Sequence, residues 1–205
     1  MRLLGPLSQI VAALLAFALG ACAGYDPRLT NRDIKYLGAG GPIIDPATKE
    51  SLALKKSYWD DNGISGPPSI VINLERQTAS FYKGGKLVGV SAISSGREGF
   101  DTPHGSYKIT QRDLNHASNL YGDYVDASGT AVVKNVDVKK DPRPTGLTFR
   151  GAPMPYFMRI TGGIGMHQGF LPGVPDSHGC IRMPEKMVTL FWNNAPLGTP
   201  VTVEQ

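Results

Sequence analysis

The chain has 205 residues, of which 41% are hydrophobic and 8% aromatic. These values are typical of a globular protein and exclude a chain that is disordered throughout. The formal net charge is +4, and the basic residues are scattered among acidic ones, which gives no indication of a nucleic-acid-binding surface. The 25 Gly and 16 Pro favour a fold of short strands and many turns.

Residues 1–21 have the organisation of an export signal. Arg2 precedes an apolar run, Ile10 to Leu19, that is too short for a permanent membrane span. The ending Leu19-Gly20-Ala21-Cys22 resembles a bacterial lipobox, which implies that Cys22 is lipidated and becomes the first residue. Ala23 follows it, and by resemblance to diderm lipoproteins this favours a periplasm-facing protein of the outer membrane. Cleavage near Ala23 to a soluble form, or an uncleaved anchor, are the alternatives.

A tether is expected over residues 22–66, and a single domain over 67–205. The tether is punctuated by Gly and Pro. It holds one expected short helix, from Pro46 to about Tyr58, with Asp45 as the N-cap.

The domain is predicted to be mainly β and sandwich-like. Between residues 69 and 75 apolar and polar residues alternate, which predicts a strand with one buried face. Gly84-Gly85 between two strand-like runs, 79–83 and 86–94, predicts a hairpin. Further strands are expected over residues 106–111, 158–160 and 200–203. Residues 112–155 form a long polar insertion with a hairpin expected around 127–138, and one helix is expected from Pro184 to about Asn194.

The densest group of chemically active residues surrounds Cys180. A thiol attacks as the thiolate, so it needs an imidazole or a positive field nearby, and we expect an imidazole to lower its pKa. His167 and His178 both precede Cys180 within a Gly- and Pro-rich stretch. Gly179 permits a sharp turn in which backbone N–H groups converge on an oxyanion. Arg182 would face the same way as Cys180 in an extended chain and suits a substrate carboxylate.

Three blocks of this sequence resemble the L,D-transpeptidase family (YkuD-type catalytic domain). The most specific is His167-x-Gly169 followed by Ser177-His178-Gly179-Cys180-Ile181-Arg182-Met183. The supporting blocks are Ser94-Ser95-Gly96-Arg97 with Thr102 to Ile109, and Gly198 to Val203. The resemblance extends from about Ser69 to Val203.

The resemblance implies a role for each residue of the site. Cys180 would be the nucleophile and His167 the base, with the carbonyl of Gln168 as the third member. His178 and Gly179 would shape the oxyanion hole, while Arg182 and Gln168 would bind substrate. Gln168 stands where many members have a smaller residue, which leaves a carbonyl role intact.

The implied reaction takes place on peptidoglycan stem peptides. Cys180 forms a thioester with a tetrapeptide stem as D-alanine leaves, and an amine acceptor resolves it, either a diaminopimelate side chain or a protein Lys. The nearest alternative is an L,D-carboxypeptidase or endopeptidase that gives the thioester to water. An alternative of another class is a non-catalytic wall-binding lipoprotein. No cofactor, metal or nucleic acid is expected. A Cys22–Cys180 disulfide and a zinc site from His167, His178 and Cys180 are the alternatives for these residues.

Overall fold

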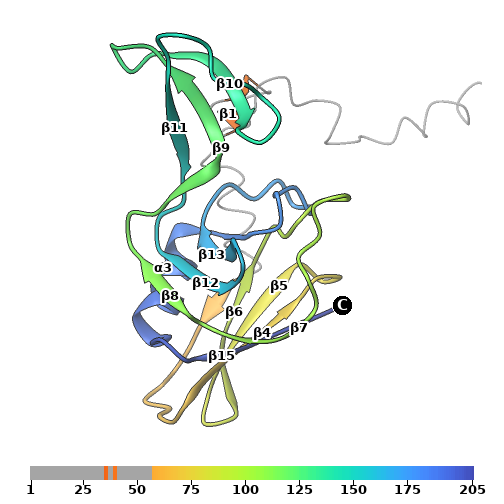
Figure 1. Cartoon of the computed structure of the whole chain (residues 1–205). Coiled ribbons are helices and arrows are strands. Elements are labelled where there is room, and N and C mark those ends of the chain that lie inside the picture. Colours follow the sequence, from red (N-terminus) through yellow and green to blue (C-terminus); the bar gives the residue numbers. More distant parts are fainter. Residues whose placement is uncertain (1–34, 37–38, 41–56) are drawn as a thin grey trace, which may run out of the picture. The chain divides into compact units, whose positions relative to one another are not determined.

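The computed structural model describes residues 35–36, 39–40 and 57–205, and the sixteen elements there comprise fifteen strands and one helix (Figure 1). In chain order they are β1 (Lys35–Tyr36), β2 (Ala39–Gly40), β3 (Tyr58–Trp59), β4 (Pro68–Asn73), β5 (Thr78–Lys83), β6 (Lys86–Ala92), β7 (Gly105–Lys108), β8 (Gln111–Asp113), β9 (Ala117–Val125), β10 (Ala131–Asp137), β11 (Thr148–Pro153), β12 (Phe157–Thr161), β13 (Ile164–Gln168), β14 (Ile181–Met183), α3 (Glu185–Asn194) and β15 (Pro200–Glu204). Within this part of the chain, no helix is long and apolar enough to cross a membrane. The expected export signal lies outside the described residues, as does the expected helix from Pro46 apart from its end, where Tyr58 belongs to β3.

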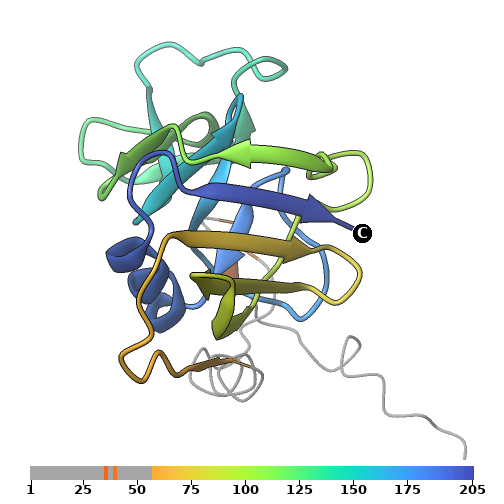
Figure 2. The same cartoon turned by 90° about the horizontal axis from the view of Figure 1, so that it is seen from below.

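The largest sheet has six strands in the order β3-β6-β5-β4-β15-β7. The predicted hairpin is confirmed as β5 and β6, joined by Gly84 and Gly85 with φ of 55° and 78°. Two consecutive positive φ values are favourable for glycine and match the twist of a hairpin. β15 enters between β4, to which it is parallel, and β7, as Figure 2 shows. The C-terminal strand is therefore an internal strand of this sheet, next to the edge strand β7.

The second sheet has four strands in the order β14-β13-β12-β8, and its two faces differ in character. Because side chains alternate along a strand, one face carries Met158, Met166 and Ile181, all fully buried in the main core. The other face carries Phe157, His167 and Arg182. One face of this sheet thus stabilises the fold, and the other bears the residues with chemistry.

The predicted helix after the Cys motif is confirmed as α3, with Pro184 as its N-cap. Its buried residues, Met187, Val188 and Phe191, pack into the same core as the large sheet. Phe191 meets Phe81 of β5 edge to face, with ring centroids 5.0 Å apart. Truncation of such a buried Phe to Ala costs about 3–5 kcal/mol. The helix therefore anchors the segment that leaves β14.

The insertion is more ordered than the sequence suggested. The expected hairpin around 127–138 is wrong in its bounds, because β9 and β10 already pair from Tyr121 to Asp137. β11 pairs with the other edge of β9, which makes a three-stranded sheet, β10-β9-β11, that stands apart from the two larger sheets in Figure 1. The alternation in this polar segment is weak because most of β10 is exposed.

The expected strand over 106–111 is divided between two sheets. β7 pairs with β15, whereas β8 pairs with β12. Between them Ile109 donates to the carbonyl of Thr199, and Thr110 donates to that of Arg159. The chain thus crosses from one sheet to the other at this point, which a pattern of alternation within one strand does not reveal.

Candidate active site

The turn that carries Cys180 is held by two hydroxyl groups. Ser177 Oγ donates to the carbonyl of Cys180 at 2.5 Å and accepts from the amide of Gly179 at 3.0 Å. Thr102 Oγ1 donates to the carbonyl of Gly179 at 2.7 Å. Gly179 has a φ of 107°, a conformation that L side chains rarely adopt. The Gly is therefore needed for the turn, and its N–H is used inside the turn.

His167 lies in β13 and is 3% exposed. Its Nδ1 is 2.7 Å from the carbonyl oxygen of Gln168, which can only accept, so Nδ1 carries the proton in this bond. The lone pair is then on Nε2, which has no hydrogen-bond partner among the described residues. Burial lowers the pKa of His167 to about 4, although the Gln168 carbonyl opposes this. The imidazole is therefore neutral at pH 7, with one nitrogen ready to accept a proton.

Strand pairing brings His167 and Cys180 to one face of the small sheet. β13 and β14 are parallel, with His167 opposite Arg182 and Met166 opposite Ile181. Cys180 immediately precedes β14, so along the extended chain its side chain shares the face of Arg182 and His167. Gly165 lies opposite Cys180 in this register, and its backbone N–H lies close enough to favour the thiolate. His167 thus lies in one strand of this pair, and Cys180 directly precedes the other.

The surroundings of Cys180 disfavour the thiolate form. Burial raises the pKa of Cys180, an effect that the Gly165 N–H and the charge of Arg159 only partly oppose. The thiol donates to the carbonyl of Gly163, with an Sγ–O distance of 3.6 Å. In this structure burial acts against the expected lowering of the thiol pKa by a neighbouring imidazole, because desolvation disfavours the charged form of both groups.

His178 is enclosed by aromatic and cationic side chains. Tyr121 of β9 stacks on its ring at a centroid distance of 4.3 Å, and Phe100 meets it edge to face at 4.7 Å. Arg97 Nη2 lies 2.9 Å from Nε2 and can only donate, so Nε2 accepts and Nδ1 carries the proton. Burial and the Arg97 charge both lower the pKa of His178. His178 is therefore a neutral ring whose lone pair is already used.

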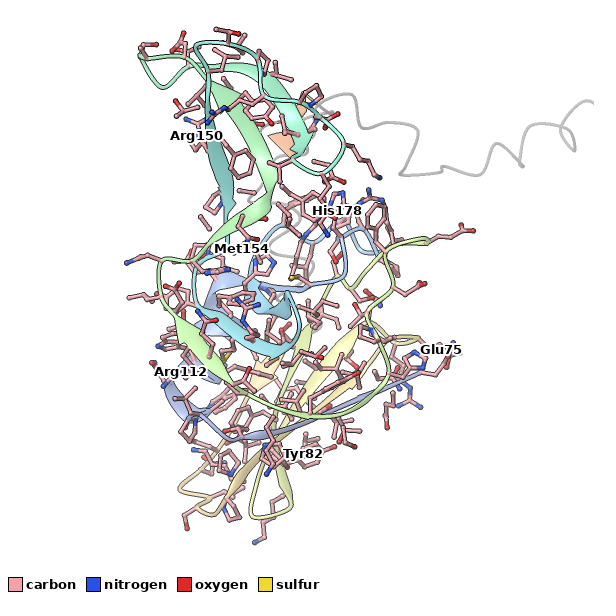
Figure 3. The ribbon with its side chains drawn as sticks, viewed as in Figure 1. Glu75, Tyr82, Arg112, Arg150, Met154 and His178 are labelled. Carbon is pink, nitrogen blue, oxygen red and sulfur yellow. The ribbon has the colours of Figure 1, made fainter. Side chains whose placement is uncertain are left out.

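Figure 3 shows His178 where the three-stranded sheet meets the loops of the Cys180 turn. The contact is made by Tyr121, which comes from the insertion. The insertion thus contributes directly to the surroundings of the candidate nucleophile.

Arg182 occupies a different position from the one expected of a substrate ligand. Its side chain is 2% exposed, and its guanidinium donates to the carboxylate of Asp176 at 3.0 Å and to the Asp176 carbonyl at 2.9 Å. Burial lowers its pKa to about 10, which still leaves it charged at neutral pH. Its backbone pairs with Ser94 in an antiparallel bridge. In this structure Arg182 supports the turn and does not present donors to a ligand.

Gln168 contributes its backbone rather than its side chain. The carbonyl holds Nδ1 of His167, whereas the side-chain amide lies 3.3 Å from the Glu185 carboxylate at the start of α3. The departure at Gln168 therefore leaves the carbonyl position unchanged.

Several residues of the site had no assigned role from the sequence. These are the residues that hold or surround the turn: Arg97, Phe100, Thr102, Tyr121, Asp176 and Ser177. Arg97, Thr102 and Ser177 stand inside the blocks that resemble the family, so a signal for them was present. Tyr121 stands in the insertion, where the sequence offered none.

The comparisons with known proteins identify the family. The family model of YkuD, the L,D-transpeptidase catalytic domain, matches residues 67–203. The chain belongs to this family. None of the curated proteins matches the sequence.

Several solved structures that are similar to this chain are described as L,D-transpeptidases. An L,D-transpeptidase from Mycobacterium smegmatis has 17% identity and a TM-score of 0.50, covering 68% of this chain and 59% of that one. One from Stackebrandtia nassauensis has 17% identity and a TM-score of 0.49, covering 81% and 69%. One from Xylanimonas cellulosilytica has 21% identity and a TM-score of 0.49, covering 68% and 61%. The first of these supports the mainly β catalytic-domain fold, and the chain spans about three fifths of its length.

Proposed function

We propose that this chain is a peptidoglycan L,D-transpeptidase that acts through a thioester on Cys180. The observation that carries the proposal is the pairing of β13 with β14: His167 lies in β13, Cys180 directly precedes β14, and the Gln168 carbonyl orients the imidazole. Membership of the family supplies the substrate class, the stem peptides of peptidoglycan. Neither a metal nor a cofactor takes part.

The first half-reaction forms the thioester and releases D-alanine. Sγ of Cys180 attacks the carbonyl carbon between the third and fourth stem residues, while its proton passes to Nε2 of His167. The intermediate collapses, the C–N bond breaks, and the imidazolium returns the proton to the leaving amine. Because the starting pair is neutral, proton transfer accompanies the attack instead of preceding it.

The backbone N–H of Cys180 is the proposed oxyanion donor. It has no hydrogen-bond partner in the described part of the chain, whereas the Gly179 N–H is occupied by Ser177 Oγ. A preorganised N–H aimed at the developing oxyanion stabilises the transition state more than the ground state. Gly179 and His178 then act by shaping the turn that aims this group.

The second half-reaction transfers the acyl group to an amine. The acceptor amine, on a diaminopimelate side chain or a protein Lys, attacks the thioester carbonyl and gives its proton to His167. The C–S bond breaks, and the proton returns to Sγ, which restores the neutral pair. The product is a 3→3 cross-link or a protein tied to the wall.

Product analysis with Cys180→Ala tests the proposal. Purified protein is incubated with disaccharide tetrapeptide, with and without an added amine acceptor, and the products and the intact protein are analysed by mass spectrometry. Wild type should release D-alanine, carry a transient acyl adduct and form cross-linked dimers, and Cys180→Ala should do none of these while melting at a similar temperature. D-alanine release with tripeptide as the sole product would identify a hydrolase. Release by the Ala variant at the wild-type rate would remove Cys180 from the mechanism.

We further propose that the enzyme works in the cell envelope, held to the outer membrane by lipid on Cys22. The lipobox-like ending at Cys22 supports this, and the residues that follow would tether the catalytic domain near its polymer.

A further inference from the structure

Arg97 occupies a fixed position at the edge of the Cys180 site. It follows β6 in a loop whose backbone is tied to the Cys180 turn, since its amide donates to the Ser177 carbonyl at 3.1 Å. The guanidinium lies over the Phe100 ring, 4.4 Å from its centroid, and contacts Nε2 of His178 at 2.9 Å. Such a stacked and hydrogen-bonded cation loses little further freedom when it binds a ligand.

The guanidinium keeps donors for a ligand. Of its five N–H groups, one points to His178 and one to the Ser177 carbonyl at 3.4 Å. The described residues provide no partner for the others, and the side chain is only partly buried. Arg97 therefore combines a fixed charge with N–H groups that a planar acceptor can reach.

Two other arginines lie near the site, and they differ from Arg97 in their partners. Arg182 is buried against Asp176. Arg159 donates to the side chain of Gln111 at 2.7 Å and to the Gly162 carbonyl at 2.5 Å. Arg159 keeps as many N–H groups as Arg97, but only Arg97 of these two contacts His178 and Ser177 of the Cys180 turn among the described residues.

The surroundings of Arg97 favour an anion. Lys140, from the insertion, has its Nζ 6.0 Å from the centroid of the Phe100 ring. The same Nζ lies 3.7 Å from the carboxylate of Asp137. Asp176 also lies near Arg97, but it is paired with Arg182. With this pair included, three cations and two carboxylates leave a net positive charge. Burial raises the pKa of Tyr121, and Asp137, Arg97 and Cys180 are each close enough to shift it as well. Arg97 and Cys180 are therefore both neighbours of Tyr121.

We propose that Arg97 binds a carboxylate of the peptide that reacts with Cys180. That this peptide is a stem peptide rests on the proposed function, but the anion preference of the site does not. The stem offers two carboxylates close to the bond that is cut: the terminal one on the leaving D-alanine and the one on the side chain of the third residue. A planar carboxylate matches the guanidinium fork in either case.

Alkylation of Cys180 tests the anion preference without any peptide. Iodoacetate and iodoacetamide alkylate the same sulfur, but iodoacetate carries a carboxylate where iodoacetamide carries a neutral amide. Rates of both are measured for wild type, Arg97→Gln, Arg97→Lys and Arg143→Gln, the last being an exposed cation of the insertion as the matched control. The ratio of the two rates cancels any change in thiol pKa or in the position of His178.

Arg97→Gln should lower the iodoacetate-to-iodoacetamide ratio about three- to tenfold, as expected for one partly screened charge. Arg97→Lys should restore most of the ratio, and Arg143→Gln should leave it at the wild-type value. A ratio unchanged in Arg97→Gln, or lowered equally in Arg143→Gln, would overturn the proposal. This outcome is independent of whether the protein turns over stem peptides.

Amidated substrates then distinguish the two carboxylates. Arg97→Gln should raise KM for the unmodified tetrapeptide about tenfold with a smaller effect on kcat, the size expected for a charge-assisted hydrogen bond. Whichever carboxamide substrate shows the same KM with wild type and variant identifies the carboxylate that Arg97 binds. A variant that raises KM equally for all three peptides would show that Arg97 recognises neither group. If wild type turns over no stem peptide, the proposed function fails while the alkylation ratio still decides the role of Arg97.

Discussion

Replacement of His167 by Asn tests whether the resting active site is a neutral pair. Burial lowers the pKa of His167 to about 4, so only about one imidazole in a thousand is protonated at pH 7. A neutral ring contributes little electrostatic stabilisation to the thiolate. We therefore expect the ionisation midpoint of Cys180 to change by less than about half a unit in His167→Asn. The same substitution removes the general base and should lower kcat about 10²- to 10⁴-fold.

The assay is the rate of iodoacetamide alkylation as a function of pH, followed by intact mass. The wild-type midpoint should lie above that of an ordinary thiol, because burial raises the pKa of Cys180. His104→Asn is the matched control, since His104 is an exposed histidine. Because His167 must be neutral to act, kcat/KM of wild type should fall on the acid side only as the pH approaches about 4.

A different dependence of alkylation on pH would contradict the neutral pair of Cys180 and His167. A wild-type midpoint well below the ordinary thiol value, moving up by more than about one unit in His167→Asn, would mean a thiolate–imidazolium pair. A larger loss of kcat in His178→Asn than in His167→Asn would reverse the roles of the two histidines. Thermal melting of each variant separates these effects from a loss of folded protein.

Three further substitutions test the turn and the N-terminus. Asp176→Asn removes the charge partner of Arg182, whose side chain is 2% exposed. Because Asp176 itself is 39% exposed, we expect a smaller loss of unfolding free energy than for a fully buried pair, about 1–3 kcal/mol in urea denaturation. The exposed control Asp101→Asn should show no change. Equal stability of the two variants would mean that the pair contributes nothing. Gly179→Ala places a side chain at a φ of 107° and should lower the free energy of unfolding by about 1–3 kcal/mol. The variant should melt at a lower temperature and show reduced acylation of Cys180. Wild-type behaviour in both measurements would contradict the strained turn. Cys22→Ser should move the protein from the membrane fraction to a soluble or unprocessed form, and a wild type already soluble with an N-terminus beyond Cys22 would contradict the lipobox.

The local patterns of the sequence predicted the elements that depend on local physics. The Gly84-Gly85 hairpin follows from backbone freedom at positive φ, and α3 follows from Pro184 at its start and an apolar stripe. The division of residues 106–111 between two sheets was missed, since alternation reports only which side chains are buried, and not against which partner strand. β13 and β14 were missed as well. They are short, and their burial on both sides removes the alternation.

The sequence alone determined the family, and it predicts Cys180 as the nucleophile and His167 as its partner, because these depend on residue types in a specific order. Only the tertiary structure decided their states. Whether a thiol or an imidazole is charged depends on solvent exposure and on neighbours far away in the chain, and both change on folding. The same holds for the arginines: Arg182 stands two positions after Cys180 in the motif but is buried against Asp176. Arg97, more than eighty residues earlier, is brought to His178 with donors still available, because the loop after β6 packs on the Cys180 turn.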